Sequence, residues 1–245
     1  MHAKNGFKIK YDSAYLDVRL KGSGIEKIGE FPLAFSCLRT SKTDKKEPFV
    51  NVYLAKIPQG VIVERVYPNC RNEEMESVTN AKIKLQKYCS WKLLECGIEH
   101  TFGVRFTDVN FNLNESGKWA CDLCEFSISH SSNMVSVAIS QKPVGIDVER
   151  VQAPKVDISK EILSTGELEV YNALAKDEKV PFLIGAWAKK ESLFKIKNKK
   201  SLSKEEFKSQ SGIVLQAMLL ALGEEFALSV ATEYPKNVKV FTVDL

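Results

Sequence analysis

Apolar residues recur with two different periods along the chain, and this alternation limits the fold more than any other feature of the sequence. Residues 50–57 and 133–140 look like strands, and residues 143–150 place apolar side chains at every second position, which is typical of a strand with one buried face. Residues 77–98 and 181–196 space them at three and four, which is typical of an amphipathic helix. Strand and helix patterns occur in both halves of the chain, so the sequence predicts an α+β fold.

Glycine, proline and serine mark where individual elements are expected to begin and end. Gly97 is expected to end the first of the two helices, and Pro181 is expected in the first turn of the second. Ser164, followed three residues later by Glu167, predicts a capping box at another helix start. Residues 114–117, Asn-Glu-Ser-Gly, predict the turn of a hairpin between two strands.

The length of the chain, 245 residues, suits one large domain or two small ones. We expect an N-terminal α+β half over residues 1–141 and a C-terminal α+β half over residues 142–245. The first 50 residues or so are harder to interpret: residues 6–22 alternate like a strand, and the region is expected to form a poorly matched extension of the N-terminal half.

The composition, with 44% apolar and 27% charged residues, is that of an ordinary soluble globular protein. No apolar run approaches the roughly 20 residues of a membrane span, and the opening residues lack the apolar core of a secretory signal. We therefore expect a cytoplasmic protein without a membrane partner. A net charge of +4 argues against a dedicated nucleic-acid binder, although the six lysines within residues 189–200 suit an anionic partner.

Six cysteines occur in the chain, and two of them, Cys121 and Cys124, form a lone Cys-x-x-Cys. For a chain of this size without an export signal, reduced thiols are expected. Tetrahedral zinc needs about four ligands, and no second cysteine pair or paired histidine stands nearby. Two thiols lining a strand is the preferred interpretation, with zinc or redox chemistry as the alternative.

Residues 143–150, PVGIDVER, place two acids on one face of a predicted strand. Val144, Ile146 and Val148 alternate with Asp147 and Glu149, so both carboxylates lie on the face opposite the apolar one. Their alpha carbons are expected about 7 Å apart, within reach of one ion. The alternative is a half-exposed edge strand whose acidic face is wet.

The helix predicted over residues 181–196 has an apolar stripe that is interrupted by charge. Leu183, Trp187 and Phe194 follow the stripe, but Lys190 or Glu191 stands where it would be completed. A charge beside an apolar face is costly unless it is paired or binds a metal. The alternative is a surface pair between Glu191 and the lysine four residues later.

Taken together, the strand and the helix predict an oxygen-rich site for a metal and a phosphate. Asp147 and Glu149 supply two carboxylates, and Glu191 supplies a third if the helix packs on the strand. Hard cations such as magnesium prefer such ligands and keep substrate phosphates as further ligands. The neighbouring lysines suit those phosphates.

Several segments resemble the signature motifs of 4'-phosphopantetheinyl transferases. The sequence VGIDVER at 144–150 resembles the Gly-Ile-Asp-Val/Ile-Glu strand of these enzymes, and WAKKESLFK at 187–195 resembles their W-x-x-K-E-Ala/Ser-x-x-K helix. Residues 126–131, FSISHS, are similar to a Ser-His-Ser segment of the family. Residues 115–122 are similar to its Gly-Lys-Pro turn, and residues 199–203 are similar to its Gly-Lys-Gly-Leu-Ser tail.

The chain length and the single copy of each motif resemble the larger, monomeric, surfactin-synthetase-activating type. The resemblance implies two similar α+β halves that form a pseudo-dimer, with the active site at their interface. It implies transfer of the 4'-phosphopantetheine arm of coenzyme A, the co-substrate, to a serine hydroxyl of an apo acyl or peptidyl carrier protein. Adenosine 3',5'-bisphosphate would be released, and Mg²⁺ is the expected cofactor, with Mn²⁺ as the alternative.

The resemblance also implies roles for individual residues, carried over motif by motif. The implied metal ligands are Asp147, Glu149 and Glu191. The implied catalytic residues are Glu191, which resembles the acceptor of the serine proton, and Lys195. The implied coenzyme A contacts are Gly117, Lys118, Ser129, His130, Lys190 and Lys195.

The sequence departs from the family pattern at Trp119, which stands where the family usually has proline. The basic residues that bind coenzyme A near the amino terminus of relatives have only candidates here, namely Arg71, Lys82 and Lys84. Carrier proteins are commonly acidic, and the lysines that follow the helix are expected to attract them.

Two other classes of function use similar features. A magnesium-dependent phosphohydrolase or nuclease also needs clustered carboxylates, but it does not need the W-x-x-K-E-S-x-x-K helix. A binding module derived from a transferase is expected to have lost one of the acids. Asp147, Glu149 and Glu191 are all present, which argues against that class.

Overall fold

A computed structural model describes residues 48–197, 199–221, 223–235 and 238–245 of the chain. It contains both strands and helices, which confirms the α+β class. The strands are β1 (Val50–Lys56), β2 (Phe111–Leu113), β3 (Trp119–Cys121), β4 (Glu125–Ser131), β5 (Met134–Ser140), β6 (Val144–Arg150), β7 (Val214–Ala221), β8 (Glu224–Thr232) and β9 (Val238–Val243). The helices are α1 (Asn69–Glu76), α2 (Ala81–Phe102), the 3-10 turn η1 (Phe106–Asp108), α3 (Ser159–Ile162), α4 (Thr165–Ala173), α5 (Lys176–Ile196) and α6 (Lys204–Lys208). Most of the predicted extension over the first 50 residues lies outside the described ranges.

The strands form two larger sheets and one short hairpin. The first sheet has the order β4-β5-β1-β9, with β1 antiparallel to β5 and parallel to β9. The second sheet has the order β6-β8-β7 and is antiparallel throughout. The predicted hairpin over the Asn-Glu-Ser-Gly turn is the pair β2–β3. The last strand, β9, thus joins the first sheet. The division of the chain into two halves near residue 142, and their relation as a pseudo-dimer, stay predictions.

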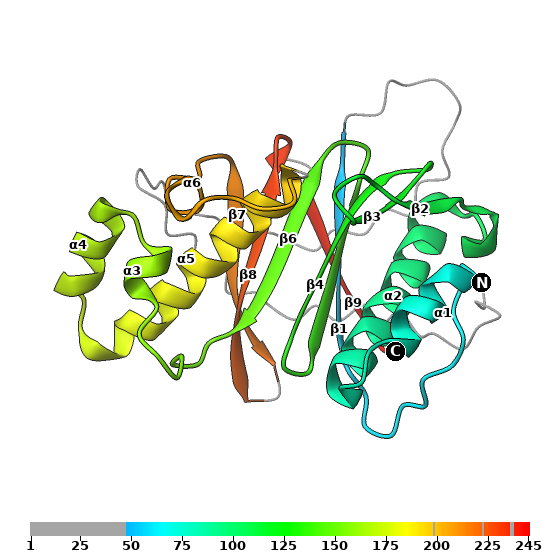
Figure 1. The fold of residues 1–245 in the computed structure, drawn as a ribbon, viewed down its shortest axis with the longest axis horizontal. Helices are drawn as coiled ribbons and strands as arrows, with labels where there is room; N and C mark the ends of the chain where they lie inside the picture. The colour runs from blue at the N-terminus through cyan, green and yellow to red at the C-terminus, as the bar shows by residue number, and fades with distance from the viewer. Residues whose placement is uncertain (1–47, 198, 222, 236–237) are drawn as a thin grey trace.

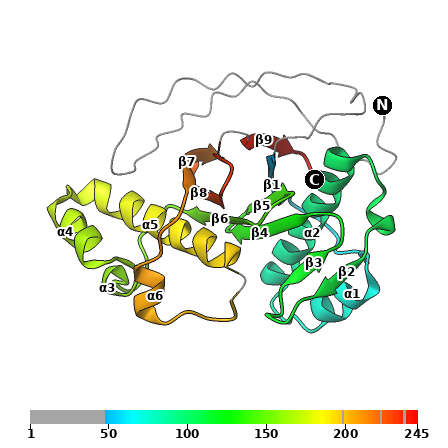
Figure 2. The same cartoon turned by 90° about the horizontal axis from the view of Figure 1, so that it is seen from above.

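Four layers follow one another across the molecule: α2, the first sheet, the second sheet and α5 (Figures 1 and 2). On β1, Tyr53 packs toward α2, whereas its neighbours Val52 and Leu54 pack toward Ile146 and Val148 of β6. This alternation is the period of a strand buried on both faces. The two sheets therefore share one core, and β6 lies between α5 and β4.

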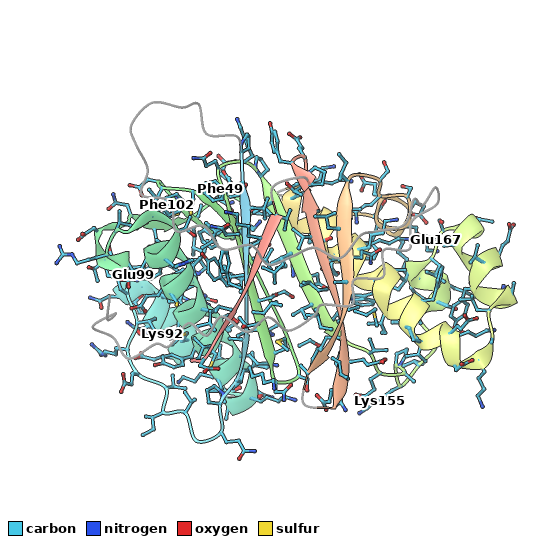
Figure 3. The ribbon with its side chains drawn as sticks, turned by 180° about the vertical axis from the view of Figure 1, so that it is seen from behind. Phe49, Lys92, Glu99, Phe102, Lys155 and Glu167 are labelled. Carbon is cyan, nitrogen blue, oxygen red and sulfur yellow. The ribbon has the colours of Figure 1, made fainter. Side chains whose placement is uncertain are left out.

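Different elements lie at the two ends of the layered structure: aromatic residues beside the first sheet at one end, and short helices around α5 at the other. Phe49 and Phe102 lie together beside the first sheet, with ring centroids 6.2 Å apart (Figure 3). Glu167 lies on the other side of the molecule, among the short helices α3, α4 and α6 that flank α5 (Figure 3).

Among the described residues, no helix combines the length and the apolar character that crossing a bilayer requires.

Helix α2 continues through Gly97, so the prediction that this glycine ends the helix is wrong. A Cβ at Gly97 would lie 2.8 Å from Cδ1 of Ile139 and 3.0 Å from the ring of Tyr53, so glycine is needed for close packing on the sheet. The helix ends instead at Gly103, whose φ of +69° forms a left-handed cap.

Helix α5 begins at Lys176, so Pro181 lies inside the helix. The prediction that Pro181 stands in the first turn is therefore wrong. The earlier start has a local cause, because the carboxylate of Glu178 accepts a hydrogen bond from the backbone N–H of Ala175 at 3.2 Å. Asp177 and Glu178 also place negative charge in the first turn, where the helix dipole favours it. The predicted capping box at Ser164 and Glu167 is confirmed at the start of α4.

Candidate functional site

The acidic face of β6 is covered by α5 rather than by solvent. Gly145 is the reason that the helix can approach, because a Cβ there would lie 1.9 Å from the backbone oxygen of Ser192. Asp147, the next residue on that face, is only 3% exposed. The interpretation of the strand as a half-exposed edge with a wet acidic face is therefore wrong.

Asp147 is bound by side chains from two different elements, β4 and α5. Its Oδ1 atom accepts hydrogen bonds from Ser129 Oγ at 2.7 Å and from Lys195 Nζ at 2.7 Å. Lys195 Nζ also donates to the backbone oxygen of Ile146 at 2.9 Å. The alternative contact for this region, an i,i+4 pair between Glu191 and Lys195, is not among the ion pairs of the described residues, because Lys195 pairs with Asp147 instead.

Glu149 and Glu191 are electrostatically unfavourable as ions in this environment. Burial, together with the charge of Asp147, raises the pKa of Glu149 to about 7, against a smaller opposing effect of the hydrogen bond from Ser131. Burial and then the charge of Asp147 raise the pKa of Glu191 as well. The site thus holds more negative charge than its one close ammonium group neutralises.

The described residues contain no group of three or more His, Cys, Asp or Glu side chains already arranged to hold a metal ion. The chemistry of the donors nevertheless fits a divalent cation. The second oxygen of Asp147, Oδ2, is buried without a hydrogen-bond partner, and a buried unpaired carboxylate oxygen is costly. A cation at Oδ2, with Glu149 and Glu191 as neighbours, would relieve both the missing contact and the excess charge.

The hairpin β2–β3 brings Lys118 to the end of α5. Gly117, with a φ of +78°, shapes the turn, and Asn114 Oδ1 accepts from the backbone N–H of Lys118 at 2.9 Å. Lys118 Nζ donates to the backbone oxygen of Lys195 at 2.8 Å. Burial lowers the pKa of Lys118. Lys118 and Lys195, both predicted contacts of coenzyme A, therefore lie at the same end of α5.

Lys190 is placed differently from the other predicted contacts of coenzyme A. Its side chain is 1% exposed, and its Nζ donates to the backbone oxygens of Ile162 at 2.7 Å and Lys208 at 2.9 Å and to the carboxylate of Glu167. An ammonium group has three protons to donate, so these partners use all of them. Lys190 joins α5 to the short helices, and a phosphate contact would require it to give up one of these bonds.

Ser129 and His130 lie next to each other on β4, at the seam between the two sheets. The hydroxyl of Ser129 is occupied, because it donates to Asp147 and accepts from the backbone N–H of Val148 at 3.3 Å. Burial lowers the pKa of His130, which favours the neutral ring near pH 7. Their assignment as coenzyme A contacts stays a prediction.

A pocket of about 280 Å³ lies beside Glu191, and its other lining residues come from α3, α5, α6 and the segment between the last two. Phe194, Leu202 and Phe207 make part of its wall apolar. Glu191, the predicted metal ligand and proton acceptor, therefore also faces a cavity.

Sequence reasoning did not single out Ser127 and Ser131, the neighbours of Ser129 on the same face of β4. Their hydroxyls accept hydrogen bonds from the backbone N–H groups of Ile146 at 3.1 Å and Arg150 at 3.1 Å. The alternating serines of FSISHS could have indicated these contacts. A row of polar residues on one face of a strand is, however, also typical of a face exposed to solvent.

The candidate Arg71 is a packing residue in this structure, and is 6% exposed. Its guanidinium lies 4.7 Å from the ring centroid of Trp91, and it pairs with Glu74. Trp119, the residue that replaces the family's proline, donates from Nε1 to Glu74 at 2.7 Å. The departure from the family pattern thus ties the hairpin to α1. The other two candidates, Lys82 and Lys84, lie at the start of α2.

The model of the 4'-phosphopantetheinyl transferase superfamily matches residues 143–227, which run from β6 through α5 to the beginning of β8. The chain is also 31% identical over 107 residues to a holo-[acyl-carrier-protein] synthase of Mycoplasma mycoides, and the match covers 96% of that relative and 38% of this chain.

The chain belongs to the 4'-phosphopantetheinyl transferase superfamily.

Larger relatives match over part of their length. The chain is 32% identical over 110 residues to the 4'-phosphopantetheinyl transferase Sfp of Bacillus subtilis, covering 44% of this chain and 49% of that relative. It is 35% identical over 89 residues to the 4'-phosphopantetheinyl transferase gsp of Aneurinibacillus migulanus, covering 36% of this chain and 38% of that relative. The chain thus spans about half or less of the length of these superfamily members.

Proposed function

We propose that this chain transfers the 4'-phosphopantetheine arm of coenzyme A to a serine hydroxyl of an apo acyl or peptidyl carrier protein, with release of adenosine 3',5'-bisphosphate. Membership of the superfamily supports this activity, since the relatives named above are phosphopantetheinyl transferases and a holo-[acyl-carrier-protein] synthase. One observation carries the proposal: Asp147 is buried and paired with Lys195, and its charge raises the pKa of both Glu149 and Glu191, so the three carboxylates lie near one another.

Asp147, Glu149 and Glu191 are the residues that would hold Mg²⁺, with Mn²⁺ as the alternative. A divalent ion bound there supplies neutralisation of the charge on the pyrophosphate. The support is the unpartnered Oδ2 atom of Asp147 and the raised pKa of the two glutamates.

Glu191 is the proposed acceptor of the proton that leaves the carrier serine, directly or through one water. The serine oxygen forms a bond to the phosphorus that bears the pantetheine arm, and the bond from that phosphorus to the oxygen of the leaving nucleotide breaks. The raised pKa of Glu191 makes its ionised form a stronger base than an exposed glutamate. Its position on the wall of the pocket gives the serine a route to it.

The basic residues at the end of α5 are the proposed contacts of coenzyme A. Lys195 would oppose the charge of the pyrophosphate, and Lys118, with Gly117 beside it, would lie along the nucleotide. The neutral ring of His130 can donate one hydrogen bond to a phosphate. Ser129 and Lys190 are the remaining proposed contacts, and each would have to give up a hydrogen bond that its side chain already makes.

The proposed partners are an acidic carrier protein and coenzyme A, and the proposed state is a cytoplasmic monomer that binds neither nucleic acid nor membrane. Lys197, Lys199 and Lys200 follow α5 directly and are exposed, where they would steer an acidic carrier toward the site.

The test is to incubate the full chain with apo carrier protein, coenzyme A and Mg²⁺, and to follow the intact mass of the carrier. We expect a mass gain equal to the phosphopantetheine arm, together with one equivalent of adenosine 3',5'-bisphosphate. Absence of the gain on acyl, aryl and peptidyl carriers alike would contradict the proposal. Release of inorganic phosphate or mononucleotides without the gain would favour a phosphohydrolase instead.

A further inference from the structure

Three serines of β4 form a regular row of contacts with the edge of β6. The Oγ atoms of Ser127, Ser129 and Ser131 accept hydrogen bonds from the backbone N–H groups 19 residues further on, at 3.1, 3.3 and 3.1 Å. Within the described residues, β6 is the end strand of its sheet. The hydroxyls therefore satisfy amides that would otherwise be buried without a partner at the sheet edge.

Two members of this row also hold a carboxylate of the candidate metal site. Ser129 donates to Oδ1 of Asp147 at 2.7 Å, and Ser131 donates to Oε2 of Glu149 at 2.7 Å. A hydroxyl has a single proton to donate, so each serine is committed to one carboxylate oxygen. Ser127 has no carboxylate to hold, because the corresponding position on β6 is Gly145.

We propose that Ser131 is a positioning residue that holds the carboxylate of Glu149 beside Asp147 and thereby increases the affinity of this acidic site for a divalent cation. The inference rests on the proposed function only in that it assumes the same cation site. Among the described residues, the ion pairs include none with Glu149, and Ser131 is the side chain that hydrogen-bonds to it.

The physical reason lies in the length of the glutamate side chain. A free glutamate carboxylate samples many rotamers, and ordering it when the cation binds costs conformational entropy. The hydroxyl of Ser131 fixes one carboxylate oxygen in advance, and Ser131 is itself fixed by the N–H of Arg150. Groups that orient a metal ligand in this way typically change metal affinity by about 10–100-fold.

The row of serines provides its own control. Ser127→Ala and Ser131→Ala each remove one hydroxyl that accepts from a β6 amide, at the same distance of 3.1 Å. The two substitutions differ in that Ser131→Ala also removes the bond to a carboxylate. Any general loosening of the seam between the sheets should therefore affect both variants, whereas an effect on the orientation of Glu149 should be confined to Ser131→Ala.

The experiment titrates Mn²⁺ alone into the full chain, by calorimetry, for the wild type, Ser131→Ala, Ser131→Thr and Ser127→Ala. Circular dichroism and thermal melting establish that each variant is folded. We expect Ser131→Ala to raise the Kd for Mn²⁺ by about 10-fold or more. Ser131→Thr, which keeps the hydroxyl, and Ser127→Ala should both stay within about threefold of the wild type. If Ser131→Ala itself does not fold, Ser131→Thr and Ser131→Cys, which weakens the bond without removing it, replace it in the comparison.

Equal Kd values for Ser131→Ala and the wild type, or equal losses in Ser131→Ala and Ser127→Ala, would overturn the inference. So would a wild-type chain that does not bind Mn²⁺. Failure of the transferase assignment gives a different result: the carrier gains no mass, while Mn²⁺ binding still depends on Ser131.

Discussion

Gly145 on β6 lies directly against the backbone oxygen of Ser192 on α5, where a Cβ would be only 1.9 Å away. This contact sets the distance between the strand that carries Asp147 and Glu149 and the helix that carries Glu191. The helix can bring Glu191 close to these two residues because Gly145 has no side chain.

Gly145→Ala should therefore separate α5 from β6. We expect a loss of at least about 1–3 kcal/mol in the free energy of unfolding, because backbone rather than a movable side chain blocks the new methyl group. The transfer rate should fall by about 100-fold, since a shift of about 1 Å in catalytic groups has that effect.

Urea denaturation and the rate of carrier mass gain measure these two effects. The matched control is Gly166→Ala in α4, where a Cβ would meet nothing within 4 Å. It should leave the rate unchanged and raise the stability by about 0.4–1 kcal/mol. If both variants behave alike, the close approach of helix and strand does not control the site.

Lys190→Met is expected to lower the free energy of unfolding, because Lys190 has a structural role. The substitution leaves the carboxylate of Glu167 and two backbone oxygens without their shared donor. Breaking such a buried pair costs about 3–5 kcal/mol in the free energy of unfolding.

Lys189→Met, on the same helix, should cost less than about 0.5 kcal/mol. Urea denaturation measures the free energy of unfolding of both variants. A stable Lys190→Met variant with a raised KM for coenzyme A would instead favour Lys190 as a direct pyrophosphate contact.

Glu74 should make the stability of the protein depend on pH in acid. Burial alone would raise the pKa of Glu74, but hydrogen bonds from Lys87 and Trp119 and the charge of Arg71 outweigh it and lower the pKa from 4.5 to about 2. Because the folded-state pKa lies below the unfolded value, the stabilisation is present above about pH 4.5 and is lost as the pH falls toward 2.

Glu74→Gln should accordingly destabilise the protein most at pH 5 and above, with an effect that shrinks as the pH falls from 4.5 toward 2. Thermal melting at a series of pH values measures this loss of stability. The control is Glu73→Gln, which changes the exposed neighbouring glutamate. A destabilisation that is constant across the series would mean that the ionised carboxylate is not what stabilises the cluster.

Cys121 is expected to be the reactive member of the Cys-x-x-Cys pair. Its Sγ lies 3.7 Å from that of Cys124, and the hydrogen bond with the Cys124 thiol lowers the pKa of Cys121 to about 7, against the opposing effect of burial. Burial raises the pKa of the core residues Cys89 and Cys96 to about 11. Iodoacetamide at pH 7 should therefore modify Cys121 well before either of them, because the thiolate is the nucleophile.

Peptide mapping by mass spectrometry follows this reaction. Cys124→Ala, which removes the hydrogen bond, should slow the modification of Cys121 at pH 7 and move the midpoint of its pH profile upward. An unchanged profile in Cys124→Ala would show that exposure, not the neighbouring thiol, sets the reactivity.

Many elements of the fold were predictable from the spacing of apolar residues, although central strands such as β5 and β8 are buried on both faces. Errors arose where packing overrides a local signal. Gly97 and Pro181 are helix breakers in isolation, but the first allows α2 to touch the sheet and the second is tolerated within α5. Partnering between distant strands, such as β9 with β1, has no local signal at all.

The acidic residues of the candidate site were also visible in the sequence, because charge interrupts an apolar pattern there. What the sequence did not disclose is how the charges are compensated. Lys195 pairs with Asp147 across the helix–strand contact rather than with its helical neighbour Glu191, and the serines of β4 reach the carboxylates from the other half. The first contact depends on the packing of α5 on β6 and the others on the stacking of the two sheets, and a linear pattern encodes neither.

The rate at which a carrier protein gains the phosphopantetheine arm in a single turnover, with Glu191→Gln compared with Glu169→Gln, tests the central claim most directly. Both substitutions remove one negative charge from the same half of the chain, but Glu169 is exposed on α4 whereas Glu191 lies at the pocket beside Asp147. We predict a fall of about 100-fold or more for Glu191→Gln and a rate within about twofold of the wild type for Glu169→Gln. Equal rates for the two variants would contradict the claim that Glu191, with Asp147 and Glu149, forms the transferase site.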